Sequence, residues 1–223
     1  MRMRTLAPPP KLLAMQVVVY ALCAILAVCI HEVSHGYVAN FFGDHTARDA
    51  GRLTLNPLAH IDPVGTVLIP IVLAISGLPI FGYAKPVPVN VSRLRRPRNQ
   101  SVLVALAGPG VNIALAVAAI AVCRITGVHG SGVELNGGSA TIEIAYVAAV
   151  FGLVNVTLAA FNLLPIPPLD GSAVVERLVP QRFIGAYFEL RRRALPVFMV
   201  LWLLNATIFH WGGGAQTVST TSS

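Results

Sequence analysis

The sequence predicts an all-α polytopic membrane protein with about four to five transmembrane helices. Of its 223 residues, 55% are hydrophobic and 11% are charged, whereas soluble domains are usually about 25% charged. The mean hydropathy of +0.72 is correspondingly high. The apolar residues gather in runs near the roughly 20 residues that a helix needs to cross a bilayer. Together these observations favour a membrane protein over a soluble globular domain.

Four apolar runs are candidate spans, at residues 12–40, 101–124, 141–164 and 194–211. A fifth run, residues 64–81, contains prolines and glycines and is ambiguous between a full span and a re-entrant hairpin. In the stretch that follows it, Pro86 and Pro88 exclude a helix and indicate extended, edge-like backbone. We therefore expect a re-entrant or extended segment near residues 64–90.

The chain is expected to form a single integral-membrane domain over residues 1–211. Glycine, serine and threonine dominate residues 212–223, and we expect this C-terminal tail to be disordered.

The net charge of +7 comes mainly from short loops between apolar runs. Lysine and arginine concentrate at residues 82–100 and 170–194 and are absent from residues 125–140. Basic loops of membrane proteins face the cytoplasm. Residues 82–100 and 170–194 should therefore be cytoplasmic, and residues 125–140 external. The charge therefore indicates topology and does not indicate a nucleic-acid partner.

The sequence HEVSH at residues 31–35 ends the first apolar run. Residues four apart share one face of a helix, so His31 and His35 can bind one Zn²⁺ ion. The intervening Glu32 can then act as general base toward a water molecule. The motif predicts a zinc hydrolase site at membrane depth.

A catalytic zinc usually has three protein ligands, so a third must lie elsewhere. Val38 and Phe41 occupy the positions at which a metzincin motif has glycine and histidine, which excludes that class. No glutamate occurs between Glu32 and Glu134, which disfavours a zincin that uses a nearby downstream glutamate.

Asp170 is the better candidate for the third ligand. It ends a long apolar segment, follows three prolines and precedes Gly171. A carboxylate oxygen is a good zinc ligand, and such backbone is tolerated where a cavity or neighbouring protein satisfies it. The alternative is a loop aspartate that caps a helix beginning at Ser172. The residues alone leave both interpretations open.

The depth of the ligands bears on topology. If Asp170 joins the histidines, the first helix must end on the cytoplasmic side, and residues 64–81 must return to the side they left. Basic residues at the N-terminus, Arg2, Arg4 and Lys11, favour the opposite orientation of the first helix. We expect the re-entrant topology.

Two motifs together, HEVSH and NLLPIPPLDG at residues 162–171, resemble the site-2 proteases, the intramembrane zinc metalloproteases. Further stretches resemble the compact prokaryotic branch of that family, namely GRLTLNP (51–57), HIDP (60–63), KPVPVN (85–90) and AGPGVN (107–112). The resemblance covers about residues 15 to 205. We expect neither a PDZ-like insertion between residues 124 and 141 nor a CBS-like domain.

The resemblance implies an intramembrane zinc endopeptidase with zinc held by His31, His35 and Asp170 and with Glu32 activating the water. It implies transmembrane helices of other proteins as substrates. We expect a prokaryotic cell membrane as the location, and the basic loops and the position of Asp170 predict a site toward the cytoplasm. A helical substrate must unwind before cleavage, and residues 82–90 are a candidate edge for strand pairing with it.

Asn112 and Asn162 each leave two interpretations open. Asn112, in the helix that contains AGPG, is a candidate catalytic residue that donates to the developing oxyanion; the alternative is an interhelical hydrogen bond. Asn162 either orients a ligand or satisfies backbone freed by Pro165. Of the other polar residues, we expect Asp44 and His45 to be solvated.

His60 and Asp62 are two residues apart and precede Pro63, so a turn role is favoured over metal binding. The rival to an enzyme is a membrane protein that binds or transports a divalent metal through His31, His35 and Asp170. Transporters often contain inverted repeats, and no convincing repeat is present. A proteolytically silent relative is a third possibility, against which the intact motifs argue.

Overall fold

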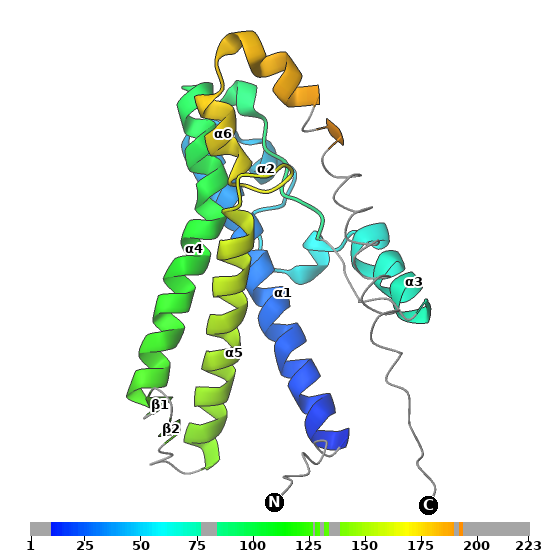
Figure 1. The fold of residues 1–223 in the computed structure, drawn as a ribbon, viewed down its shortest axis with the longest axis vertical. Helices are drawn as coiled ribbons and strands as arrows, with labels where there is room; N and C mark the ends of the chain where they lie inside the picture. The colour runs from blue at the N-terminus through cyan, green and yellow to red at the C-terminus, as the bar shows by residue number, and fades with distance from the viewer. Residues whose placement is uncertain are drawn as a thin grey trace, which may run out of the picture.

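The computed structural model describes residues 10–76, 84–126, 128–129, 132–133, 139–189 and 192–193. Three long helices, α1 (Pro10–Phe41), α4 (Pro97–Ile125) and α5 (Ser139–Asn162), form the body of the molecule (Figure 1). In this part of the chain, these three are the helices long and apolar enough to cross a membrane. They match three of the four predicted spans, and the fourth, 194–211, lies outside the described residues, as does the predicted tail.

Short elements lie between the long helices and after α5. They are α2 (Thr46–Asp49), the 3₁₀ turn η1 (Pro57–His60), the π-helical turn η2 (Pro63–Leu68), α3 (Ile69–Ile75), η3 (Val91–Arg93), the antiparallel pair β1 (Val128–His129) and β2 (Gly132–Val133), α6 (Ser172–Leu178) and η4 (Gln181–Phe183). In the described part of the chain the fold is therefore all-α, as predicted, apart from the pair of two-residue strands β1 and β2 between α4 and α5.

The long helices pack through small side chains. Gly152 of α5 faces α4 so closely that a Cβ atom there would lie 3.1 Å from the Cβ of Ala119. Cys23 and Ala27 of α1 are buried against Val154 of α5. Small residues permit this close approach of helices within a membrane, where packing must hold the bundle together.

Large apolar side chains remain exposed around the bundle. Leu22 of α1 is 62% exposed, Val117 of α4 is 60% exposed and Leu153 of α5 is 64% exposed. In water this surface would be costly, at about 25 cal/mol per Å² of apolar area. Acyl chains contact such surface without this penalty, so the exposed faces fit a lipid environment.

The segment between α1 and α4 returns to its starting point. The backbone N–H of Lys85 donates to the carbonyl of His60 at 2.8 Å, so the two described ends of this segment lie side by side. Adjacent ends are expected of a re-entrant segment, and the re-entrant topology stays a prediction. The segment includes α3, while residues 77–83 lie outside the description.

Residues 84–90 run without helical structure, as the prolines predict. The Arg52 guanidinium donates to the Lys85 carbonyl at 2.8 Å, and the Asn90 N–H donates to Asp44 at 2.6 Å. The Val87 N–H donates to Glu32 at 2.9 Å. These contacts fix the extended segment against Glu32 of α1 and against Asp44 and Arg52, which follow this helix in the chain.

Candidate metal centre

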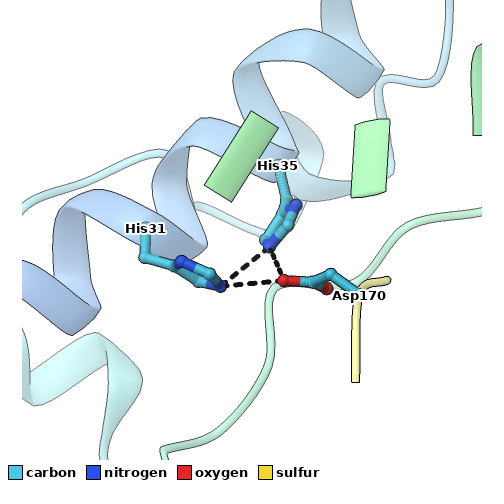
Figure 2. Close-up of side chains that lie close together, drawn as sticks. All are labelled: His31, His35 and Asp170. Atoms are coloured by element: carbon cyan, nitrogen blue, oxygen red, sulfur yellow. Dashed lines mark hydrogen bonds and ion pairs between the residues drawn. The ribbon is translucent and has the colours of Figure 1, made fainter. Parts of the chain in front are cut away.

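Three side chains from two distant stretches of sequence meet at one point (Figure 2). Helix α1 presents the rings of His31 and His35, one turn apart, and Asp170 approaches from the loop after α5. Oδ2 of Asp170 lies 3.2 Å from Nε2 of His31 and 3.4 Å from Nε2 of His35. The two Nε2 atoms are 3.1 Å apart. The structure thus brings together all three predicted metal ligands.

Hydrogen bonds fix how both rings present their nitrogen atoms. Nδ1 of His31 is 2.7 Å from Oδ1 of Asn112, and Nδ1 of His35 is 2.7 Å from the Val104 carbonyl. Both partners accept hydrogen bonds, so each Nδ1 carries the ring proton. In a neutral imidazole the other nitrogen then has a bare lone pair. Both Nε2 lone pairs therefore point at the carboxylate of Asp170.

This arrangement suits a bound cation. Three electron-rich atoms face one another, and in the described part of the chain the buried Oδ2 of Asp170 has no hydrogen-bond donor. A proton would link only two of the three atoms, whereas a metal ion satisfies all three. Because such sites fix the histidine tautomer through the other ring nitrogen, the environment of the rings also suits metal ligation.

The geometry fits zinc. Zinc binds histidine nitrogen and carboxylate oxygen at about 2.0–2.1 Å in a tetrahedral arrangement, which places ligand atoms about 3.3 Å from one another. The observed separations of 3.1, 3.2 and 3.4 Å match three edges of such a tetrahedron. Two imidazoles and one carboxylate leave the fourth position for water, as in catalytic zinc sites.

Gly108 of α4 leaves the space in which the metal would lie. A Cβ atom at this position would collide with Nε2 of His35 and would come within 2.7 Å of Nε2 of His31. Helix α4 can therefore cover the site only through a residue that lacks a side chain.

The loop that carries Asp170 is closed by a backbone contact. The N–H of Gly171 donates to the Asn162 carbonyl at 2.7 Å, and a Cβ on Gly171 would collide with the carbonyls of Leu163 and Leu164. Asp170 does not cap α6 with its side chain, because the N-cap residue is Gly171 and no side-chain cap forms. Of the two alternatives for Asp170, the structure has the carboxylate facing the histidines.

Glu32 and Asn112, the predicted catalytic residues, lie next to the ligands. Glu32 adjoins His31 on α1 and is partly buried. Asn112 is fully buried on α4, and its Nδ2 atom donates to Oδ1 of Asn155 at 2.9 Å. Asn155 was not among the residues singled out from the sequence. A polar amide inside an apolar run predicts a hydrogen-bond partner on a neighbouring helix, and this signal could have identified it. The side-chain amide of Asn162 donates to the backbone carbonyl of Leu158, also in α5, at 3.0 Å.

The expectation that Asp44 is solvated was wrong. Asp44 has no exposed surface, because its carboxylate accepts hydrogen bonds from Thr46 and from the Asn90 N–H. Burial alone would raise the pKa of Asp44, but the hydrogen bonds from Thr46 and Asn90, with the charge of Arg93, outweigh it and hold this pKa below its ordinary value. The side chain joins the end of α1 to the extended segment.

The turn role predicted for His60 and Asp62 is confirmed. The carboxylate of Asp62 accepts the N–H groups of Val64 and Gly65 at 3.0 and 2.7 Å and so caps η2. The ring of His60 donates from Nε2 to the Thr54 carbonyl at 2.8 Å. Neither residue belongs to the group of potential metal ligands found among the described residues, which consists of His31, His35 and Asp170.

Comparison with known proteins identifies the family of this chain. The model of peptidase family M50 matches residues 19–204. "Putative zinc metalloprotease YwhC" of Bacillus subtilis is 39% identical over 80% of this chain and 77% of its own length. "Putative zinc metalloprotease Rip2" is 31% identical in Mycobacterium tuberculosis, over 84% of this chain and 67% of the relative.

The Rip2 protein of Mycolicibacterium smegmatis is 33% identical over 68% of this chain and 54% of its own length. No solved structure is significantly similar. The family match covers most of the chain, including His31, His35 and Asp170, the second and third described apolar spans, and the first span from residue 19 onward. The chain therefore belongs to peptidase family M50, the site-2 proteases, and is an integral membrane zinc metalloprotease.

Proposed function

We propose that this protein hydrolyses peptide bonds within the transmembrane segments of other membrane proteins. The observation that carries the proposal is the location of the convergent His31, His35 and Asp170 atoms. Both histidines belong to the apolar span Ala14–Phe41, and both rings are buried against α4. A site at this depth meets substrates that are themselves in the bilayer.

His31, His35 and Asp170 would hold the zinc ion in the proposed reaction. Zinc supplies Lewis acidity, which lowers the pKa of water and polarises a peptide carbonyl. Glu32 takes the proton of the attacking water and delivers it to the nitrogen of the departing amine. The Val87 N–H, 2.9 Å from one carboxylate oxygen, holds Glu32 in place for this transfer.

Residues 84–90 are proposed to bind the unwound substrate. A peptide bond inside a helix is shielded, so the substrate must locally become extended before attack. An extended protein segment can recruit such a chain by strand pairing. Because Val87 already contacts Glu32, a substrate paired along this segment would run past the proton acceptor.

The metal centre is proposed to face the cytoplasm. The N–H of Arg95 donates to the Phe42 carbonyl at 3.1 Å, so the basic stretch before α4 lies at the C-terminal end of α1. Arginine also follows Asp170, on α6. The described basic residues near this end include Arg93, Arg95, Arg96, Arg98 and Arg177. Basic ends of spans face the cytoplasm, and water consumed by hydrolysis would enter from there.

The test compares the wild type with Glu32→Gln, with Glu143→Gln as control, because Glu143 is an exposed carboxylate on α5. The full chain is expressed in cells, and neo-N-termini inside apolar segments of the membrane proteome are identified by mass spectrometry. We expect such cuts with the wild type and Glu143→Gln, and none with Glu32→Gln, although Glu32→Gln retains one zinc per chain.

Cleavage by Glu32→Gln at the wild-type rate would remove the assignment of Glu32 as base. Transport of zinc by the reconstituted wild type, without any cleavage of membrane proteins, would favour a metal transporter instead.

A further inference from the structure

We propose that Asn155 is a positioning residue of the metal centre, acting through Asn112 on His31. The inference rests on the proposed zinc site and adds a residue from a third helix to it. The chain of contacts runs from α5 through α4 to α1. Both asparagines are fully buried, so no solvent substitutes for a lost partner.

Three hydrogen bonds form the chain. Nδ2 of Asn155 donates to the Phe151 carbonyl at 2.8 Å. Oδ1 of Asn155 accepts from Nδ2 of Asn112 at 2.9 Å. Oδ1 of Asn112 lies 2.7 Å from Nδ1 of His31. Each is within the normal distance range for a hydrogen bond.

The direction of these bonds is fixed at the Phe151 end. A backbone carbonyl can only accept, so Asn155 must turn its NH₂ group toward it. The oxygen of Asn155 then faces Asn112, which must answer with its own NH₂ group. That leaves the oxygen of Asn112 toward His31. Nδ1 of His31 must therefore carry the proton.

The consequence lies at the metal. With the proton held on Nδ1, Nε2 of His31 presents its lone pair toward Nε2 of His35 and Oδ2 of Asp170, 3.1 and 3.2 Å away. If Asn155 were apolar, the Asn112 amide could rotate and offer N–H to His31. The ring would then favour the tautomer with the proton on Nε2, where metal ligation needs a lone pair.

A role in packing alone does not explain the arrangement. The oxygen of Asn155 accepts from another helix, whereas the hydroxyl of Thr157, two residues further along α5, donates to the Leu153 carbonyl at 2.8 Å. Thr157 is exposed, and its bond stays within its own helix. It provides a matched control for a polar side chain of α5 that bonds back to the helix.

The experiment measures zinc affinity of the purified full-length protein in detergent by competition with a chelator. The variants are Asn155→Leu, which has the same size without hydrogen bonds, Asn155→Asp, whose carboxylate still accepts from Asn112, and Thr157→Val. We expect Asn155→Leu to bind zinc 10–100-fold more weakly, the size of effect typical for outer partners of ligating histidines. Asn155→Asp and Thr157→Val should stay close to wild type.

A second readout examines the ring directly. In ¹⁵N-histidine spectra of the metal-free protein, with His31 assigned by its absence from His31→Gln, the wild type and Asn155→Asp should show the Nδ1–H tautomer. Asn155→Leu should show an increased Nε2–H population. The spectrum reports the tautomer of His31 alone, whereas the zinc affinity of Asn155→Asp also responds to the added negative charge.

Equal zinc affinity in a folded Asn155→Leu, or an Nε2–H tautomer at His31 in the wild type, would overturn the inference. If Asn155→Leu does not fold, the wild-type spectrum alone decides. A wild type that binds no zinc would instead refute the proposed metal centre itself, which is a different result.

Discussion

The backbone N–H of Val87 donates a hydrogen bond of 2.9 Å to Oε2 of Glu32, across 55 positions of sequence. Val87 lies between Pro86 and Pro88, which have no N–H to donate. It is therefore the one amide donor within residues 86–88, and it is directed at the proposed base. The hydrogen bond therefore links the proposed substrate-binding segment, residues 84–90, directly to the proposed base, Glu32.

Replacing Val87 by proline tests this bond. Val87 lies in a segment without helical structure, so proline breaks no helix there and removes the N–H. Because a hydrogen bond to a charged group contributes about 1.5–3 kcal/mol, we expect kcat to fall about tenfold or more while zinc content stays at one per chain. Val87→Ala, which retains the N–H, is the matched control, and an equal loss of kcat in both variants would assign the effect to the side chain.

The double substitution of Pro86 and Pro88 by alanine tests the extended segment. Alanine adds two N–H groups and loosens the backbone, so we expect altered cleavage with unchanged zinc binding. Cleavage and zinc content are measured on the same preparation, with Pro180→Ala, in an exposed loop, as control. A parallel loss of both quantities would point to misfolding rather than to substrate binding.

Gly108→Ala should abolish zinc binding. The added methyl group would lie against both Nε2 atoms, within 2.7 Å of that of His31, in the space that the ion needs. Gly110 offers a control on the same helix, because a Cβ there meets nothing within 4 Å. Gly110→Ala should keep zinc and gain up to about 1 kcal/mol from helix propensity. Metal analysis of both variants checks this, and zinc retention by Gly108→Ala would contradict the site.

Removal of zinc should lower the melting temperature. A ligand that binds only the folded state stabilises it by RT ln(1 + [L]/Kd), about 4 kcal/mol at 1,000 times Kd. A chelator should therefore lower the Tm of the wild type, and added zinc should restore it. Asp170→Ala should melt at the same temperature with and without chelator. A chelator effect that survives in Asp170→Ala would exclude Asp170 as an essential ligand.

Stability in acid should depend on Asp44. Its pKa is held below the ordinary value of 3.8 by hydrogen bonds that the unfolded chain lacks. Its contribution is thus present above the unfolded pKa and is lost as the pH falls through the folded pKa. We expect the wild type to lose Tm below about pH 4, and Asp44→Asn to have a lower Tm at pH 7 and a smaller acid-dependent loss.

Asp49→Asn, at an exposed carboxylate beside Arg48, serves as the control for the acid experiment. It should follow the wild type at every pH, since exposed ion pairs contribute little. If Asp44→Asn and the wild type had parallel Tm curves from pH 7 to pH 3, the stabilising role of the buried carboxylate would be refuted.

Local patterns in the sequence predicted the helices and two thirds of the ligand set. The three described spans match the apolar runs predicted for them to within a few residues at each end. A membrane span is an uninterrupted apolar stretch, so its length can be read directly from the sequence. His31, Glu32 and His35 share one helical turn, so their proximity needs no tertiary information. The prolines at 86 and 88 likewise predicted extended backbone, because they exclude a helix by themselves.

Contacts between distant residues could not be read in this way. The sequence left Asp170 undecided between a ligand and a helix cap, and it placed Asp44 in solvent. It did not single out Asn155, whose partner Asn112 lies 43 positions away. In each case the outcome depends on which helices face one another and at what height, and composition does not encode that.

The sequence by itself therefore determined a polytopic helical protein with two histidines and a glutamate at the end of its first span, because spacing along one helix dictates which side chains share a face. Only the tertiary structure decided that the loop after α5 folds back to bring Asp170 within 3.4 Å of both rings. It also decided that an amide chain through Asn112 leads to His31. The physical reason is that close packing of α1, α4 and α5 sets these distances, and packing is a property of all three helices together.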